Sequence, residues 1–245
     1  MRMTCQTCKM KGECTFSYLG VNSKHFSCNH YQVTQNIIDR NFNFFGVEIL
    51  SRPRMKPKQK CESYGNDYID CHDDYFKKLN VLEHNKLLNE IIFKINKSLD
   101  GGHFIPRNIF LNVEKFSLLD SNLVGKLLLI SNKLRIINKN LIVEVTERHE
   151  NINEIVIQTM PNLRDQGLDL ALDDYEFRVV DGHIINHFNY VKIKILELYR
   201  HKDITDKLYY LVENNKKIIV ENIETKEQMN FALSLPIHYF QGFYV

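Results

Sequence analysis

Short apolar runs alternate with longer segments of helical periodicity along the chain from about residue 33. Apolar runs of four to eight residues are typical of buried strands, and their alternation with amphipathic segments predicts β/α units around a parallel sheet. The predicted strands span residues 35–39, 44–50, 109–113, 141–145, 168–172, 190–195, 217–221 and 239–245. The predicted helices span residues 75–96, 123–137, 153–167, 204–215 and 225–235.

Turn signals refine this pattern at three places. Only residues 40–43 separate the first two strands, which predicts that this pair is antiparallel. Gly167 stands where the third predicted helix would end before a strand. Residues 51–74 are predicted to form an irregular loop. Eight strands with intervening helices in 245 residues fit a single α/β barrel.

The composition adds little to this picture except by exclusion. The chain is 44% hydrophobic and 25% charged, with a formal net charge of +2, which is typical of a globular protein without strong attraction to nucleic acid or membrane. No apolar run approaches the roughly 20 residues that span a bilayer, and the N-terminus has no signal-peptide core. We therefore predict a cytoplasmic protein with neither DNA nor membrane as a partner.

The N-terminal segment is rich in cysteine, and we divide the chain into this segment (residues 1–32) and a barrel domain (residues 33–245). Cys5 and Cys8 have the spacing at which a turn presents two thiolates to a zinc ion, and Cys14 with Cys28 or His30 could complete the set. A second close pair is missing, so reduced, partly buried thiols are the preferred interpretation. Redox sensing by the exposed pair is a third.

Polar residues interrupt or follow the predicted strands where a barrel would place its chemistry, at the strand C-terminal ends. They are Glu48, Asn112, Glu144, Asp173, Asp174, Lys192, Glu221 and Gln241. Unpaired carboxylates are costly to bury, so several that converge require a cation. Oxygen ligands suit Mg²⁺ or Mn²⁺, and two such ions would suit phosphodiester hydrolysis, with Lys192 to orient a water or offset charge.

Each of these residues alone has a simpler interpretation. Glu48 or Glu144 could face solvent on an edge strand, Asp173 could cap the segment that follows it, and Lys192 could lie with Lys194 on the surface. The ordered set of polar residues argues against these separate explanations.

The same residues lie in motifs that resemble the EAL domain family. QNIID resembles the family's QPIVD, and GVEILSR resembles GVEALLR with Ile49 in place of alanine. FLNV supplies the strand asparagine, VEVTE resembles LEITE, and LRDQGLDLALDDY resembles LRELGVRIALDDF. YVKI, VENIET and FQGFYV resemble YLKI, AEGVET and VQGYLF. The resemblance runs in order from about residue 33 to residue 245.

The resemblance implies a (β/α)8 TIM-like barrel with an antiparallel first strand. It also implies a phosphodiesterase that opens cyclic di-GMP to linear pGpG with two Mg²⁺ or Mn²⁺ ions. The implied metal ligands are Glu48, Asn112, Glu144, Asp173 and Asp174. Glu48, Lys192 and Glu221 would form the catalytic centre, Arg52 and Gln241 would contact substrate, and Glu147 and Glu224 would support the site.

Three departures from the family pattern keep a second function open. DDYEFRVVDG replaces the family's DDFGTGYSSL loop, and Lys194 stands where an acid is common, on the same strand face as Lys192. An extra cation there would weaken metal binding. The sequence given stops at Val245, before the family's last helix. The alternative is therefore a non-catalytic cyclic di-GMP receptor or a regulator that binds another protein; a homodimer also stays open.

Overall fold

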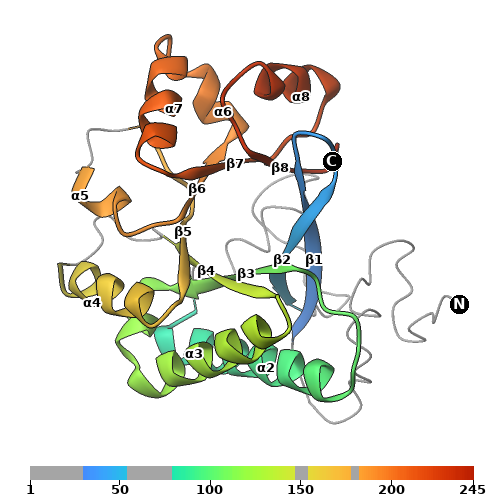
Figure 1. Ribbon diagram of the computed structural model, residues 1–245, viewed down its shortest axis with the longest axis vertical. Helices are drawn as coiled ribbons and strands as arrows, with labels where there is room; N and C mark the ends of the chain where they lie inside the picture. The colour runs from blue at the N-terminus through green and yellow to red at the C-terminus, as the bar shows by residue number, and fades with distance from the viewer. Residues whose placement is uncertain (1–29, 54–78, 147–153, 178–181) are drawn as a thin grey trace, which may run out of the picture. The chain divides into compact units, whose positions relative to one another are not determined.

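The computed structural model describes residues 30–53, 79–146, 154–177 and 182–245 (Figure 1). These residues belong to two compact units. One unit holds the described residues up to Thr34 and from Ile49 to Ile105, and the other holds Gln35–Glu48 and the described residues from Pro106 onward. The cysteines at positions 5, 8, 14 and 28 and Glu147 lie outside the described residues. The zinc site, the boundary at residue 32 and the role of Glu147 therefore stay predictions.

Eight strands in the described residues close a barrel in chain order. They are β1 (His30–Asp39), β2 (Phe44–Pro53), β3 (Asn108–Glu114), β4 (Asn140–Thr146), β5 (Asp169–Leu172), β6 (Tyr190–Lys194), β7 (Lys217–Glu221) and β8 (Tyr239–Gln241). Strands β3 to β8 are parallel, whereas β1 runs antiparallel to β8. The predicted (β/α)8 TIM-like barrel with an antiparallel first strand is confirmed.

Helices follow most of the strands. They are α2 (Val81–Asp100), the 3₁₀ turn η2 (Lys115–Leu119), α3 (Ser121–Ile136), α4 (Glu154–Asp165), α5 (Gly182–Ile185), α6 (Ile195–Tyr199), α7 (Ile204–Glu213) and α8 (Lys226–Leu233). Helices α3, α6 and α7 pack against β4, β6 and β7 respectively. Of the helices in the described ranges, none combines the length and apolar character needed to cross a bilayer.

Local signals set several element ends. Helix α2 begins at Val81 and not at residue 75, because Asn80 and Glu83 form a capping box in which each side chain accepts from the other residue's backbone N–H, both at 3.0 Å. Helix α4 ends at Asp165, and Gly167 adopts a positive φ of 86° as the sequence predicted.

Three element predictions were wrong. Residues 51–53 belong to β2 and not to a loop, and the loop predicted beyond them lies outside the described residues. Ile195 was predicted to end the strand over residues 190–195, but it is the first residue of α6. Strand β8 ends at Gln241, because Gly242 passes so close to Ile223 that a Cβ would meet the Ile223 carbonyl oxygen at 2.1 Å. No described residue after Gln241 is helical.

One layer of inward-facing side chains fills the barrel below the strand ends. Phe45 stacks on Tyr239 with ring centroids 3.8 Å apart, and Phe110 meets Tyr190 edge to face at 5.4 Å. We call this layer the barrel floor; it consists of Ile37, Phe45, Phe110, Ile142, Ala171, Tyr190, Ile219 and Tyr239. Because it is packed with apolar and aromatic groups, polar side chains next to it are held in a low-dielectric environment.

Candidate active site

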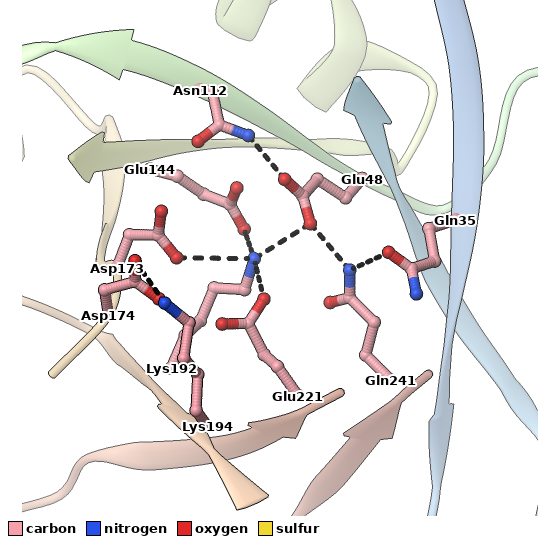
Figure 2. A network of polar contacts seen from close by, with 10 residues as sticks. All are labelled: Gln35, Glu48, Asn112, Glu144, Asp173, Asp174, Lys192, Lys194, Glu221 and Gln241. Atoms are coloured by element: carbon pink, nitrogen blue, oxygen red, sulfur yellow. Dashed lines mark hydrogen bonds and ion pairs between the residues drawn. The ribbon is translucent and has the colours of Figure 1, made fainter. Parts of the chain in front are cut away.

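A layer of polar side chains lies directly beyond the barrel floor. Side chains two residues apart on a strand share a face, so each of these residues stands two positions from a floor residue. They are Asn112, Glu144, Asp173, Lys192, Glu221 and Gln241, each two positions after a floor residue, and Gln35, two positions before Ile37 on the reversed strand β1. Glu48 of β2 joins them through its hydrogen bonds. We call this set, with Asp174, the polar layer (Figure 2).

Lys192 lies at the centre of the polar layer and is fully buried. Its Nζ lies 2.7 Å from Glu144 Oε1, 2.7 Å from Glu221 Oε1 and 3.0 Å from Glu48 Oε2, with Asp173 Oδ1 at 3.8 Å (Figure 2). One ammonium group therefore serves four carboxylates that come from four different strand ends.

Glu48 is held by amides as well as by Lys192. Gln241 Nε2 donates to Glu48 Oε2 at 2.6 Å and to Gln35 Oε1 at 3.0 Å, and Asn112 Nδ2 donates to Glu48 Oε1. Sequence reasoning did not select Gln35, although QNIID places it two residues before an apolar strand position. These contacts fix the carboxylate plane of Glu48 before any ligand arrives.

The adjacent Asp173 and Asp174 face the same space because the backbone turns between them. Neighbouring side chains in extended chain point to opposite faces, but Asp174 has a φ of 53°, in the left-handed region that aspartate tolerates. The Tyr175 N–H then donates to the Lys192 carbonyl oxygen at 2.9 Å. As a result, carboxylate oxygens of Asp173, Asp174 and Glu221 lie within 4.8 Å of one another.

Burial and mutual repulsion control the acidities in this layer. Burial raises the pKa of Asp173 to about 6 and that of Glu221 to about 8, despite attraction from Lys192. Burial and the charge of Glu48 raise the pKa of Glu144 well above its ordinary value. Burial also acts to raise the pKa of Glu48, but Lys192 and the Gln241 amide outweigh it and lower that pKa to about 2. These carboxyls crowd each other, and one lysine does not balance them.

The oxygens of the polar layer fit a divalent cation. Glu144 Oε2 and Gln241 Oε1 are buried and have no hydrogen-bond partner in the described part of the chain. Five carboxyl groups face the two ammonium groups of Lys192 and Lys194, so full ionisation would leave three negative charges uncompensated, and protons or a cation must balance them. Carboxylate and amide oxygens are the ligands that Mg²⁺ and Mn²⁺ prefer. Glu48, Asn112, Glu144, Asp173, Asp174 and Glu221 could supply them.

Comparison with known proteins identifies the family. A model of the EAL domain matches residues 78–245, which is more than half of the chain. The chain belongs to the EAL domain family. The match begins after Gln35 and Glu48, so the fold, and not the family model, brings these two residues into the polar layer. No curated protein matches the chain.

Solved structures share the fold of this EAL domain. The PaMucR phosphodiesterase in complex with c-di-GMP has a TM-score of 0.63 at 23% identity, covering 88% of this chain and 90% of that one. The FimX EAL domain from Pseudomonas aeruginosa, bound to c-di-GMP, has a TM-score of 0.65 at 17% identity over 88% and 89%. The Bacillus subtilis YkuI protein, in complex with substrate c-di-GMP and calcium, has 0.62 at 19%. This chain spans about half of YkuI, covering 54% of it.

Two further predicted residues, Arg52 and Glu224, make their described hydrogen bonds outside the polar layer. Arg52 belongs to the other compact unit, and its Nη1 donates to the Ser51 carbonyl oxygen at 3.1 Å. Glu224 is exposed, and its backbone N–H donates to Gln228 Oε1 at 2.7 Å in the cap of α8. The phosphate-binding role of Arg52 and the supporting role of Glu224 stay predictions.

The divergent loop of this EAL domain is described as far as Phe177. The Phe177 N–H donates to Glu197 Oε1 at 3.3 Å, and Glu197 on α6 also binds Arg200 Nη1 and His201 Nε2, each at 2.9 Å. Glu197 is buried. Glu197 therefore connects the loop that follows Asp174 to α6, the helix that follows Lys194.

Metal-free EAL domain is expected to lose stability as pH rises from about 4.5 to about 8. Asp173 and Glu221 have raised pKa values, so the folded state binds more protons than the unfolded state in this window, and the free energy of unfolding falls with pH. Glu48 acts in the opposite sense only below this window, because its pKa is lowered. Divalent ions compete with these protons and should restore stability most at high pH.

Thermal unfolding between pH 5 and 8.5, with EDTA and with Mg²⁺, measures this effect. We expect the difference between the two midpoints to widen with pH by roughly 5 °C or more, since about 1 kcal/mol shifts the midpoint of a chain this size by about 2–4 °C. A difference that stays constant across the range would show that these carboxyls do not bind the ion.

Proposed function

We propose that this EAL domain hydrolyses cyclic di-GMP to linear pGpG in a reaction that depends on Mg²⁺ or Mn²⁺. The observation that carries the proposal is the convergence of Glu48, Glu144, Asp173 and Glu221 on one buried lysine, with a carboxylate oxygen of Glu144 that has no hydrogen-bond partner among the described residues. The family supports a cyclic di-GMP phosphodiesterase, and neighbours of the same fold are described as c-di-GMP complexes.

The proposed reaction replaces one P–O3′ bond with a bond from phosphorus to the oxygen of water, and the water proton ends on the departing O3′ hydroxyl. Divalent ions bound to the polar layer would supply Lewis-acid activation of the water and stabilise charge on the phosphate. The protein's own contribution is positional. Lys192 and Gln241 hold the Glu48 carboxylate ionised and oriented, and Lys192 adds a buried positive charge beneath the reacting phosphate.

Purified protein incubated with cyclic di-GMP and Mn²⁺ is expected to release pGpG, and excess EDTA is expected to stop the reaction. Separation of the two nucleotides by chromatography measures both. Folded protein that yields no pGpG with either Mn²⁺ or Mg²⁺ would contradict the proposed activity.

A non-catalytic receptor is the second candidate, and one contact favours it. Lys194 Nζ lies 2.8 Å from Asp174 Oδ2, where a divalent ion would otherwise take up this oxygen. A receptor would bind cyclic di-GMP in calorimetry and leave it intact after prolonged incubation with Mn²⁺. Hydrolysis at any rate that EDTA abolishes would exclude this candidate.

A further inference from the structure

Lys194 is a second cation at the rim of the polar layer. It ends strand β6 in register with Glu221 of β7, and its Nζ lies 2.8 Å from Asp174 Oδ2. Both side chains are 49% exposed, in contrast to the fully buried Lys192. Figure 2 shows the two lysines rising side by side from β6, with Lys194 directed to Asp174.

The two lysines interact with overlapping sets of carboxylates. Lys192 contacts Glu48, Glu144, Glu221 and, at longer distance, Asp173. Lys194 is hydrogen-bonded to Asp174 and attracted to Asp173 and Glu221. The residues that Lys194 faces are therefore the same three whose oxygens lie within 4.8 Å of one another.

A separate observation indicates that a ligand is expected next to these three residues. Glu144 is fully buried, Lys192 contacts its Oε1, and its Oε2 has no hydrogen-bond partner in the described ranges. Glu144 stands close enough to Asp173 and Glu221 to feel the charge of both. A buried carboxyl oxygen beside other carboxyls requires a proton or a cation, and a divalent ion that binds there displaces the proton.

We propose that the Lys194 ammonium competes with a divalent ion for the Asp173–Asp174–Glu221 group, so that this group binds its ion weakly. We therefore expect this group to be occupied second, after the ion that the rest of the polar layer binds. This inference rests on the proposed function only in assuming that divalent ions bind the polar layer.

The geometry explains why the competition weakens binding and does not prevent it. An ion pair between half-exposed partners contributes little, so an incoming ion can take Asp174 from Lys194. The displaced ammonium nevertheless remains tethered to the end of β6, next to Glu221, and repels a divalent ion within a few ångströms. The expected penalty is about tenfold or more in affinity.

Titration of metal-free protein with Mn²⁺ alone tests the proposal, with bound ions counted by calorimetry and by the electron paramagnetic resonance signal of free Mn²⁺. Wild type should bind one ion tightly and a second weakly. In Lys194→Met the second dissociation constant should fall about tenfold or more, while the first should change less than about threefold. Lys202→Met, which removes the same charge at the exposed turn before α7, should match wild type.

Three outcomes would overturn the proposal. They are an unchanged second dissociation constant in Lys194→Met, an equal improvement in Lys202→Met, and no Mn²⁺ binding in any folded variant. Hydrolysis is measured separately, so the two proposals can fail independently. If Lys194→Met binds its second Mn²⁺ more tightly but the wild-type protein has no phosphodiesterase activity, this inference is supported and the proposed function is contradicted. If the protein hydrolyses cyclic di-GMP but the second Mn²⁺ affinity does not change, the proposed function is supported and this inference is contradicted.

Discussion

Replacement of Glu48 by glutamine is expected to lower the rate of cyclic di-GMP hydrolysis on the order of a thousandfold or more. The pKa of Glu48 is lowered to about 2, so this carboxylate is ionised and available to a cation at neutral pH. The Glu48→Gln variant keeps the shape of the side chain but removes its charge. Its new NH2 group would meet a donor at either oxygen position, because Lys192 and Gln241 donate to Glu48 Oε2 and Asn112 donates to Glu48 Oε1.

The measurement is the initial rate of pGpG release at saturating Mn²⁺, compared with wild type. Glu227→Gln is the matched control, because Glu227 is exposed in the first turn of α8, and its rate should equal that of wild type. Far-ultraviolet circular dichroism establishes that both variants are folded. A Glu48→Gln rate within tenfold of wild type would mean that Glu48 is not an essential ligand.

Replacement of Lys192 by methionine is expected to destabilise the metal-free protein by about 3–5 kcal/mol at pH 7.5. Methionine has a similar length but no charge, so Glu48, Glu144 and Glu221 would lose their shared partner inside the barrel. The loss should shrink when Mn²⁺ is added, because a divalent ion replaces the missing charge, and it should shrink below pH 5 as the carboxyls protonate. Urea unfolding with EDTA and with Mn²⁺ measures both effects.

Lys216→Met is the control for removal of a buried lysine. Lys216 is also buried, but its Nζ donates to the Phe188 and Asn186 carbonyl oxygens at 2.9 and 3.3 Å. Its loss should cost about 1–2 kcal/mol and should not respond to Mn²⁺. If Mn²⁺ restores the free energy of unfolding of both variants equally, or restores that of neither variant, the charge balance assigned to Lys192 is wrong.

Most of the barrel could be predicted because its strands are short apolar runs with clear turn signals between them. Strand β7 was predicted with both its ends correct, and Gly167 marks a helix end by its positive φ. Helix α6 was missed because the residues of YVKIKILELY are apolar or alternate in a way that suits either a strand or a helix. Only tertiary packing decides where the strand stops.

The members of the site could be predicted, but their pairing could not. Period-two geometry explains why Asn112, Glu144, Lys192 and Glu221 share an inward face, and the family motifs named them. Nothing in the sequence states that Asp174 adopts a left-handed backbone or that Gln35 reaches Gln241 across the β1–β8 pair. These features depend on the pairing of strands that are far apart in the sequence, such as the antiparallel pairing of β1 with β8.

The barrel floor also gives the polar layer two unequal sides. The buried floor residues Ile142 and Tyr190 lie two strand positions below the fully buried Glu144 and Lys192, whereas Asp174 and Lys194 are half exposed. Solvent therefore reaches the polar layer from the side of Asp174 and Lys194 and not through the floor. A nucleotide bound over the side of Asp174 and Lys194 would therefore slow the exchange of ions between the polar layer and solvent until the product departs.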